Sequence, residues 1–283
     1  MDGSGGCEAM LVALRAGDEV FHRPQYLKDE ARFHLLGQIS AFPDALRIKS
    51  GDGVLLYAQS PGRNAWLWVD PSAPEDVRLG RIRELAERLG GDDLPGVIGD
   101  PADARAFADA YAAGRRIAWT ERLTLVPYEC REIRREAAAE GELRRASGDD
   151  RYTAARFLAG FSRDAYGETV GAFTQLPAAD RMIGEDGLYF WTVGGECVAM
   201  ANIAHRSTRH GRISAVYTRP DARGRGFGSA ITAALTRMLL GEGLTPMLYA
   251  DAANPASNRV YRRIGYEPLG PVVEIGFHRE ESA

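Results

Sequence analysis

The stretch Arg212-Ile-Ser-Ala-Val-Tyr-Thr-Arg-Pro-Asp-Ala-Arg-Gly-Arg-Gly-Phe-Gly-Ser229 decides the fold of the second half of this chain. Its first part predicts a strand over 212–218, because Ile, Val, Tyr and Thr favour strands and Pro220 ends the run. The residues from Ser229 to Leu240 predict an amphipathic helix, because apolar side chains recur there at helical spacing. Between the two lies a turn rich in glycine and arginine.

Strand, glycine-rich turn and helix together form an arrangement that binds phosphate. Glycines let the backbone approach an anion closely, and the free N–H groups of the helix start point at it. Arg223 and Arg225 add positive charge. Two common phosphate-binding patterns are excluded: no Gly-Lys-Ser/Thr ends this loop, and the glycines do not have the GxGxxG dinucleotide spacing.

The spacing Arg-x-x-Gly-x-Gly, made by Arg223, Gly226 and Gly228, resembles the acyl-CoA pyrophosphate loop of the GNAT superfamily of N-acetyltransferases. On the loop alone, the alternative is a helix start with flexible glycines and solvated arginines.

A second stretch strengthens this resemblance. Proteins of the superfamily close their cofactor site with a helix that carries Asn, then Tyr seven residues later, then Gly-Phe or Gly-Tyr. Asn254, Tyr261, Gly265 and Tyr266 match that pattern in register, after a predicted strand at 246–250. Pro255 suits the first position of such a helix, and Gly265 suits its end.

The resemblance covers about residues 140–283 and implies an α/β fold with a mixed sheet. Two parallel central strands that separate at their ends would open a slot for the pantetheine arm of the cofactor. The expected elements of this half, in chain order, are 143–146, 151–161, 178–183, 188–193, 197–203, 212–218, 229–240, 246–250, 255–264 and 266–278.

The first half has a similar order of predicted elements. They are a helix-rich start at 18–42, strands at 54–59 and 65–69, a helix at 75–89, a strand at 96–99, a helix at 101–113 and a strand at 117–127. The glycine loop and the Asn and Tyr pattern are missing, so we interpret this half as a degenerate GNAT-like repeat. An unrelated α/β domain is the alternative. We therefore expect domains at 1–137 and 138–283, joined by a charged linker at about 131–140.

Composition excludes several classes of protein. The net charge of −4 gives no support for nucleic-acid binding, and no apolar run is long enough to span a membrane. The first residues do not form a signal peptide. Cys7, Cys130 and Cys197 are odd in number and widely spaced, which argues against disulfides and a metal site. We expect reduced thiols in a cytoplasmic protein, either a monomer or a homodimer.

The resemblance implies roles for individual residues. Backbone N–H groups of the glycine loop would hold the pyrophosphate, and the end of the strand would bind the pantetheine through its main chain. Tyr261 would protonate the leaving thiolate; the alternative is a core aromatic residue. The expected acetyl-CoA contacts are Val216, Tyr217, Thr218, Arg223, Gly224, Arg225, Gly226, Phe227, Gly228, Ser229, Asn254 and Asn258.

The general base is a gap in this pattern. Many superfamily members carry Glu on the central strand, whereas 213–217 here contains no carboxylate. Water could relay the proton, and Glu168 and Asp251 are candidates that are each better explained as surface charges. His205 and His210 flank a predicted turn, so we expect them to be exposed rather than catalytic.

The resemblance implies an acetyl-CoA-dependent N-acetyltransferase that acts on a primary amine of a small molecule. Two alternatives stay open. Because the usual carboxylate is missing, the chain could be a non-catalytic acyl-CoA-binding or regulatory protein. Tandem GNAT chains also include enzymes of thiol-cofactor biosynthesis.

Overall fold

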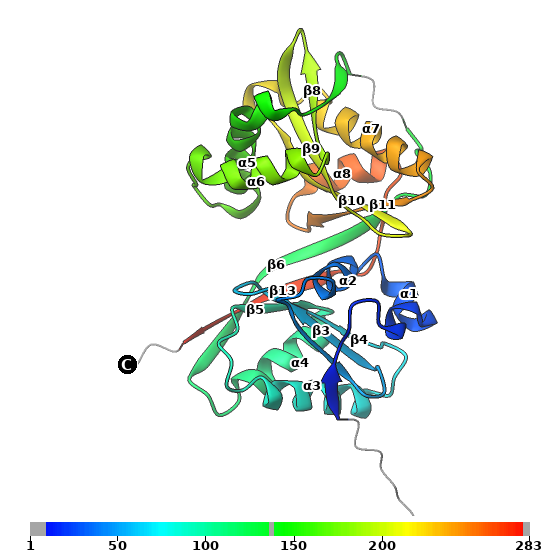
Figure 1. Cartoon of the computed structure of the whole chain (residues 1–283), viewed down its shortest axis with the longest axis vertical. Coiled ribbons are helices and arrows are strands. Elements are labelled where there is room, and N and C mark those ends of the chain that lie inside the picture. Colours follow the sequence, from blue (N-terminus) through cyan, green and yellow to red (C-terminus); the bar gives the residue numbers. More distant parts are fainter. Residues whose placement is uncertain (1–9, 136–138, 280–283) are drawn as a thin grey trace, which may run out of the picture. The chain divides into compact units, whose positions relative to one another are not determined.

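The computed structural model describes residues 10–135 and 139–279. These residues form two compact units: unit 1 runs up to Val126 and resumes at Gly270, and unit 2 is Pro127–Leu269. Each unit combines β-strands with helices that pack on them (Figure 1). The expected α/β class with a mixed sheet is confirmed.

The described part of unit 1 contains seven strands in the order β1-β2-β3-β4-β5-β13-β6. Strands β4 and β5 pair in parallel and the other neighbours pair antiparallel. Its strands are β1 (Leu11–Ala13), β2 (Leu46–Ser50), β3 (Leu55–Gln59), β4 (Ala65–Val69), β5 (Gly96–Gly99), β6 (Ile117–Glu129) and β13 (Val272–Arg279). Its helices are η1 (Glu19–His22), α1 (Pro24–Asp29), α2 (His34–Ser40), α3 (Glu75–Arg88) and α4 (Pro101–Ala112).

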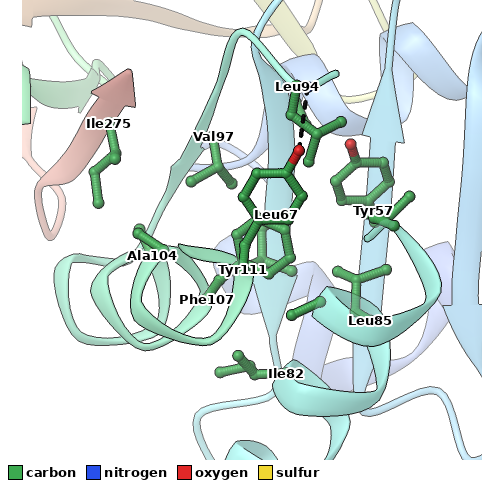
Figure 2. Packing of buried hydrophobic residues seen from close by; sticks show 14 of the residues in the cluster. Tyr57, Leu67, Ile82, Leu85, Leu94, Val97, Ala104, Phe107, Tyr111 and Ile275 are labelled. Atoms are coloured by element: carbon green, nitrogen blue, oxygen red, sulfur yellow. Dashed lines mark hydrogen bonds between the residues drawn. The ribbon is translucent and has the colours of Figure 1, made fainter. Parts of the chain in front are cut away.

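The core of unit 1 lies between its sheet and helices α3 and α4. Strand β4 is a continuous apolar run, β3 is apolar except for Gln59, and both are buried along their whole length. Leu85 of α3 and Phe107 of α4 are fully buried in this cluster, together with Tyr111 (Figure 2). The Tyr111 hydroxyl donates to the Asp92 carbonyl at 2.5 Å and accepts from the Leu94 N–H at 3.4 Å, so this buried phenol is satisfied.

Unit 2 contains a sheet in the order β11-β10-β9-β8-β7, in which β10 and β11 are parallel. Figure 1 shows α5 and α6 on one side of strands β8–β10, and α7 and α8 on the other. The last residues of β6 pair with β12 in this unit. Its strands are β7 (Glu142–Arg145), β8 (Leu188–Val193), β9 (Glu196–Arg206), β10 (His210–Thr218), β11 (Thr245–Asp251) and β12 (Glu267–Pro268). Its helices are η2 (Gly148–Asp150), α5 (Arg151–Tyr166), η3 (Ala172–Gln175), α6 (Leu176–Gly184), η4 (Pro220–Ala222), α7 (Phe227–Gly241) and α8 (Pro255–Ile264).

The two units repeat one order of elements. In each, an antiparallel pair is followed by a helix, by a strand parallel to the second member of the pair, and by another helix. That last helix begins with proline in both units, and Phe107 of α4 has the offset from Pro101 that Tyr261 of α8 has from Pro255. The turn into α3 has Pro74 at the cap and contains no glycine. Unit 1 therefore has the same order of elements as unit 2, but it lacks the glycine loop before α3 and has Phe107 in place of a tyrosine on α4.

The bounds of the compact units differ from the predicted domains 1–137 and 138–283. The border falls inside β6, between Val126 and Pro127. Strand β13, expected in the second half, pairs with β5 and β6 in unit 1, where Val273, Ile275 and Phe277 join the core. Alternating apolar residues predict a strand but do not tell which sheet it joins. Folding of the predicted domains as separate entities stays a prediction.

Candidate functional site

Strand β10 is interrupted by a β-bulge. Ser214 pairs with Asn202 of β9 and Tyr217 pairs with Met200, so two residues of β10 lie opposite one residue of β9. The bulged Ala215 has a φ of +50°, which is unusual for a residue other than glycine. The bulge changes which face each side chain occupies. Ile213 before it packs in the cluster under α7, whereas Tyr217 after it packs under α5.

Strands β10 and β11 separate after a short paired segment. Only His210–Arg212 and Thr245–Met247 are in parallel register, although both strands continue for several residues. Within the described chain, Ile213–Thr218 therefore has no strand partner on its β11 side. The expected separation of the two parallel strands is confirmed. A free strand edge of this kind can bind an extended chain through its backbone.

The loop after β10 leads into the start of α7. Gly224 and Gly226 have φ angles of +77° and +86°, a conformation that favours glycine. Gly226 is the N-cap of α7, and no side chain of the described residues caps that helix start. Among the described residues, the nearest neighbour of a Cβ on Gly226 would be Ala139 Cβ, at 4.0 Å, so no described atom fills the space beside this glycine. Uncapped N–H groups next to open space fit a phosphate group.

The two arginines of the loop have different surroundings. Arg223 donates to the Thr218 carbonyl at 3.1 Å, forms an ion pair with Asp164 of α5, and lies 5.6 Å from the centre of the Tyr217 ring. These contacts fix the loop against β10 and α5. Arg225 stacks on Phe227 at 4.8 Å and forms an ion pair with Glu140 at 3.8 Å, and its side chain is 54% exposed, against 48% for Arg223. An incoming phosphate can therefore reach both cations, and Arg225 has fewer contacts that hold it to the rest of unit 2.

The two asparagines predicted to contact the cofactor hold the start of α8. The Asn254 Oδ1 atom accepts from the Ser257 N–H at 3.1 Å, as an N-cap does. The Asn258 amide donates to the carbonyls of Asp251 and Asn254, both at 2.7 Å, and accepts from the Tyr128 hydroxyl at 2.8 Å. The structure gives both side chains a structural task, and their contacts with a cofactor stay predictions.

Tyr261 lies on α8 between two other tyrosines. Its ring centre is 6.1 Å from that of Tyr128 and 6.0 Å from that of Tyr266. The Tyr128 hydroxyl bonds Asn258, and the Tyr266 hydroxyl bonds that of Thr236 at 2.8 Å. Among the described residues the Tyr261 hydroxyl has no such partner. Burial raises the pKa of Tyr261 to about 12, so the phenol keeps its proton at neutral pH.

The candidates for a general base lie at different depths. Glu168 is exposed just after α5, and Asp251 accepts from the Ala253 N–H at 2.8 Å at the end of β11. His205 and His210 were expected to be exposed, which is wrong: His205 is half-buried and His210 is buried. The reason is that β9 and β10 extend to Arg206 and from His210, so both histidines lie within strands.

Arg212 of β10 was not predicted as a site residue, because a single arginine in a strand carries no motif. It lies directly across from His205. Burial, and then the charge of Arg212, lower the pKa of His205, which keeps this imidazole neutral at pH 7.

Within residues 10–135 and 139–279, no cluster of His, Cys, Asp and Glu is arranged to hold a metal ion. None of the helices in that part of the chain is both long and apolar enough to span a bilayer. Cys130 and Cys197 are free thiols, and Cys7 lies outside the described residues.

Comparison with known proteins places this site in a family context. The model of the FR47-like protein family matches residues 192–271, which include the glycine loop and α8. The mycothiol acetyltransferase of Streptomyces scabiei is 33% identical over 172 residues, 55% of this chain and 55% of that enzyme. That of Streptomyces avermitilis is 28% identical over 278 residues, 93% of this chain and 88% of that enzyme. A solved acetyltransferase from the GNAT family of Colwellia psychrerythraea superposes with a TM-score of 0.58 at 11% identity, over 95% of this chain and 99% of that one.

The extent of these matches varies. The match with this chain spans 20%, 55% and 33% of the length of three curated relatives, all of them mycothiol acetyltransferases of Streptomyces. The solved structure covers almost the whole chain and shows the fold of both units.

Proposed function

We propose that this chain, a member of the GNAT superfamily, is an acetyl-CoA-dependent N-acetyltransferase that acts on the primary amine of a small molecule. The observation that carries the proposal lies in the described part of unit 2: the start of α7 has no side-chain cap, no described atom lies closer than 4.0 Å to a Cβ on Gly226, and β11 leaves the nearby edge of β10 unpaired. A phosphate group fits the first feature and an extended pantetheine chain fits the second. The curated relatives named above support acetyl transfer.

The residues of unit 2 would hold the cofactor as follows. Backbone N–H groups from Arg225 to Ser229 bind the pyrophosphate, with the exposed Arg225 side chain beside them. The main chain of Val216 and Thr218, on the free edge of β10, binds the pantetheine. Arg223 keeps the loop in place through Asp164. When bound, acetyl-CoA supplies an acetyl group activated as a thioester.

Tyr261 is the proton donor to the leaving sulfur in this proposal. Its phenol is protonated at neutral pH, and no described residue occupies its hydroxyl with a hydrogen bond. A donor of this kind is available to a reacting atom, whereas the hydroxyls of Tyr128 and Tyr266 are already bonded. The acceptor amine must lose its own proton, and the described part of β10 offers no carboxylate for that step.

Two measurements test this function together. Isothermal titration with acetyl-CoA measures binding, and release of free CoA over a panel of amines measures transfer. The proposal expects both. Tight binding without CoA release on any amine would favour the non-catalytic acyl-CoA-binding alternative, and no binding would contradict the proposal as a whole.

A second candidate function has the same reaction but names the acceptor amine. Six curated relatives are named mycothiol acetyltransferase, two of them matched over 93% and 92% of this chain, which favours an enzyme of thiol-cofactor biosynthesis. The unacetylated precursor of mycothiol would then be the preferred amine in the panel. A cytoplasmic location and a monomeric or homodimeric state are further parts of the proposal, to be checked by cell fractionation and light scattering.

A further inference from the structure

A cation on the central strand of unit 2 lacks a partner among the described residues. Arg212 is half-buried, and its Nε atom is completely enclosed without a hydrogen bond. No ion pair or hydrogen bond of Arg212 exists within the described chain. Burial lowers the pKa of this guanidinium, but arginine stays charged at any physiological pH. An enclosed polar atom without a partner destabilises a fold, so a ligand that completes the hydrogen bonds of this guanidinium is the physical explanation to test.

The position of Arg212 connects it with the proposed reaction. Arg212 and Met247 are the last registered pair of β10 and β11, so Arg212 lies where the two strands begin to separate. Ile213, next in the strand, packs under α7, so by strand alternation Arg212 points to the opposite face, where α5 packs. The thioester end of a cofactor held along this edge would lie near the point of separation. An acceptor bound at Arg212 can therefore approach the thioester from the face of the sheet on which α5 packs.

The other side chains around Arg212 suit an anion. The phenol groups of Tyr249 on β11 and Tyr166 at the end of α5 lie close enough to interact with its charge. His205, across the strand pair, stays neutral, so Arg212 is the fixed positive charge of this group.

Asn202 adds a hydrogen-bond acceptor on the same face. It pairs with Ser214, two residues beyond Arg212, and its side chain is 2% exposed. Its Oδ1 atom is buried without a partner among the described residues. Asn202 thus leaves a second buried polar atom unsatisfied by the described chain, on the face of the central strands to which Arg212 points. Native structures contain few such atoms, so this face of unit 2 calls for a polar partner.

We infer that unit 2 has a subsite for an acidic acceptor, in which Arg212 binds a carboxylate or phosphate group of the molecule whose amine is acetylated. This inference rests on the proposed acetyltransferase function and narrows its substrate class to amines that carry an anion. The guanidinium offers two parallel N–H donors, which match both oxyanions and fix the orientation of the acceptor.

The test compares each acidic amine with an uncharged analogue on the full chain. One pair is an amino acid and its carboxamide, and the other is glucosamine 6-phosphate and glucosamine. Binding to the CoA-loaded protein is measured by thermal shift, which needs no turnover, and kcat/KM is measured by CoA release. The inference expects the acidic member of at least one pair to bind and react about 10- to 100-fold better. The pair that shows the preference tells carboxylate from phosphate.

Variants then assign the preference to Arg212. Arg212→Met should abolish the preference, with acetyl-CoA affinity unchanged by isothermal titration, and Arg212→Lys should keep part of it. Arg209→Met is the control, because Arg209 is an exposed arginine in the turn between β9 and β10. Arg212→Met should not lower the melting temperature, since the Arg212 side chain makes no hydrogen bond within the described chain that the variant would lose.

Several results would overturn the inference. One is equal binding of both members in both pairs by the wild-type protein. Another is a fall of melting temperature in Arg212→Met with an equal loss for charged and uncharged amines, which would show a structural role. Failure of the proposed function itself looks different, because the wild-type protein would then not bind acetyl-CoA at all.

Discussion

Tyr261 and Tyr266 form a natural pair for separating catalysis from stability. Both are buried, but Tyr266 bonds Thr236 whereas no described residue bonds the Tyr261 hydroxyl. If the phenol of Tyr261 protonates the leaving sulfur, Tyr261→Phe should lower the single-turnover rate by about 10²- to 10⁴-fold. The Michaelis constant for acetyl-CoA and the melting temperature should change little.

The matched variant is expected to behave in the opposite way. Tyr266→Phe removes the bond to Thr236 and should lower the free energy of unfolding by about 1 kcal/mol, with the single-turnover rate retained. Denaturant unfolding and rapid-quench kinetics on both variants give the two quantities. A Tyr261→Phe protein that is destabilised but reacts at the wild-type rate would make Tyr261 a core residue and remove it from the mechanism.

At the scale of elements, the short helix η2, which leads into α5, depends on one carboxylate. Asp150 accepts two hydrogen bonds from Arg144 at 2.8 Å and one from the Ser147 N–H at 2.7 Å. The bonds from Arg144, above all, lower the pKa of Asp150 to about 2. Because the folded pKa lies below the unfolded one of about 3.9, this stabilisation is present above pH 4 and is lost as the pH falls toward 2.

Asp150→Asn should therefore lower the free energy of unfolding by about 1 kcal/mol at pH 7, because the capping box of η2 loses its charged acceptor. The bonds from Arg144 contribute to this figure, but less than the pKa of Asp150 suggests, since the Arg144 side chain is 41% exposed and solvent screens its charge. Urea unfolding of both proteins at pH 7 and at pH 3 measures the difference. The difference in free energy of unfolding between the two proteins should be smaller at pH 3 than at pH 7. An equal difference at both pH values would show that the charge of Asp150 is not what stabilises η2.

The elements that could be predicted from sequence are those with local signals. The glycine loop and the Asn254–Tyr261 helix depend on spacing within one short stretch, and their elements form where expected. Arg212 and the internal bonds of Asn258 could not be predicted, because both depend on residues far away in the sequence. Strand β2 was missed since Arg47 and Lys49 dilute its apolar pattern.

At the scale of the whole molecule, the strand pairings predict which fragment folds. A fragment of residues 127–269 keeps Tyr128, which bonds Asn258 and packs against Tyr261. A fragment of residues 138–283 lacks Tyr128 and carries β13, whose apolar side chains belong to the core of unit 1. We expect the first fragment to be soluble and to bind acetyl-CoA, and the second to aggregate. Size-exclusion chromatography and isothermal titration check this. A well-folded, fully active 138–283 fragment would support the domain border predicted from the sequence instead.

The most direct test of the account is the affinity for acetyl-CoA of two matched glycine variants. Gly226 and Gly243 have φ angles of +86° and +77°, and a Cβ on either would have no described protein atom closer than 4.0 Å, so valine strains both sites alike. Only Gly226 lies at the start of α7. Isothermal titration should show binding by Gly243→Val at wild-type affinity and no measurable binding by Gly226→Val. Equal affinities for the two folded variants would contradict the cofactor site proposed for this loop.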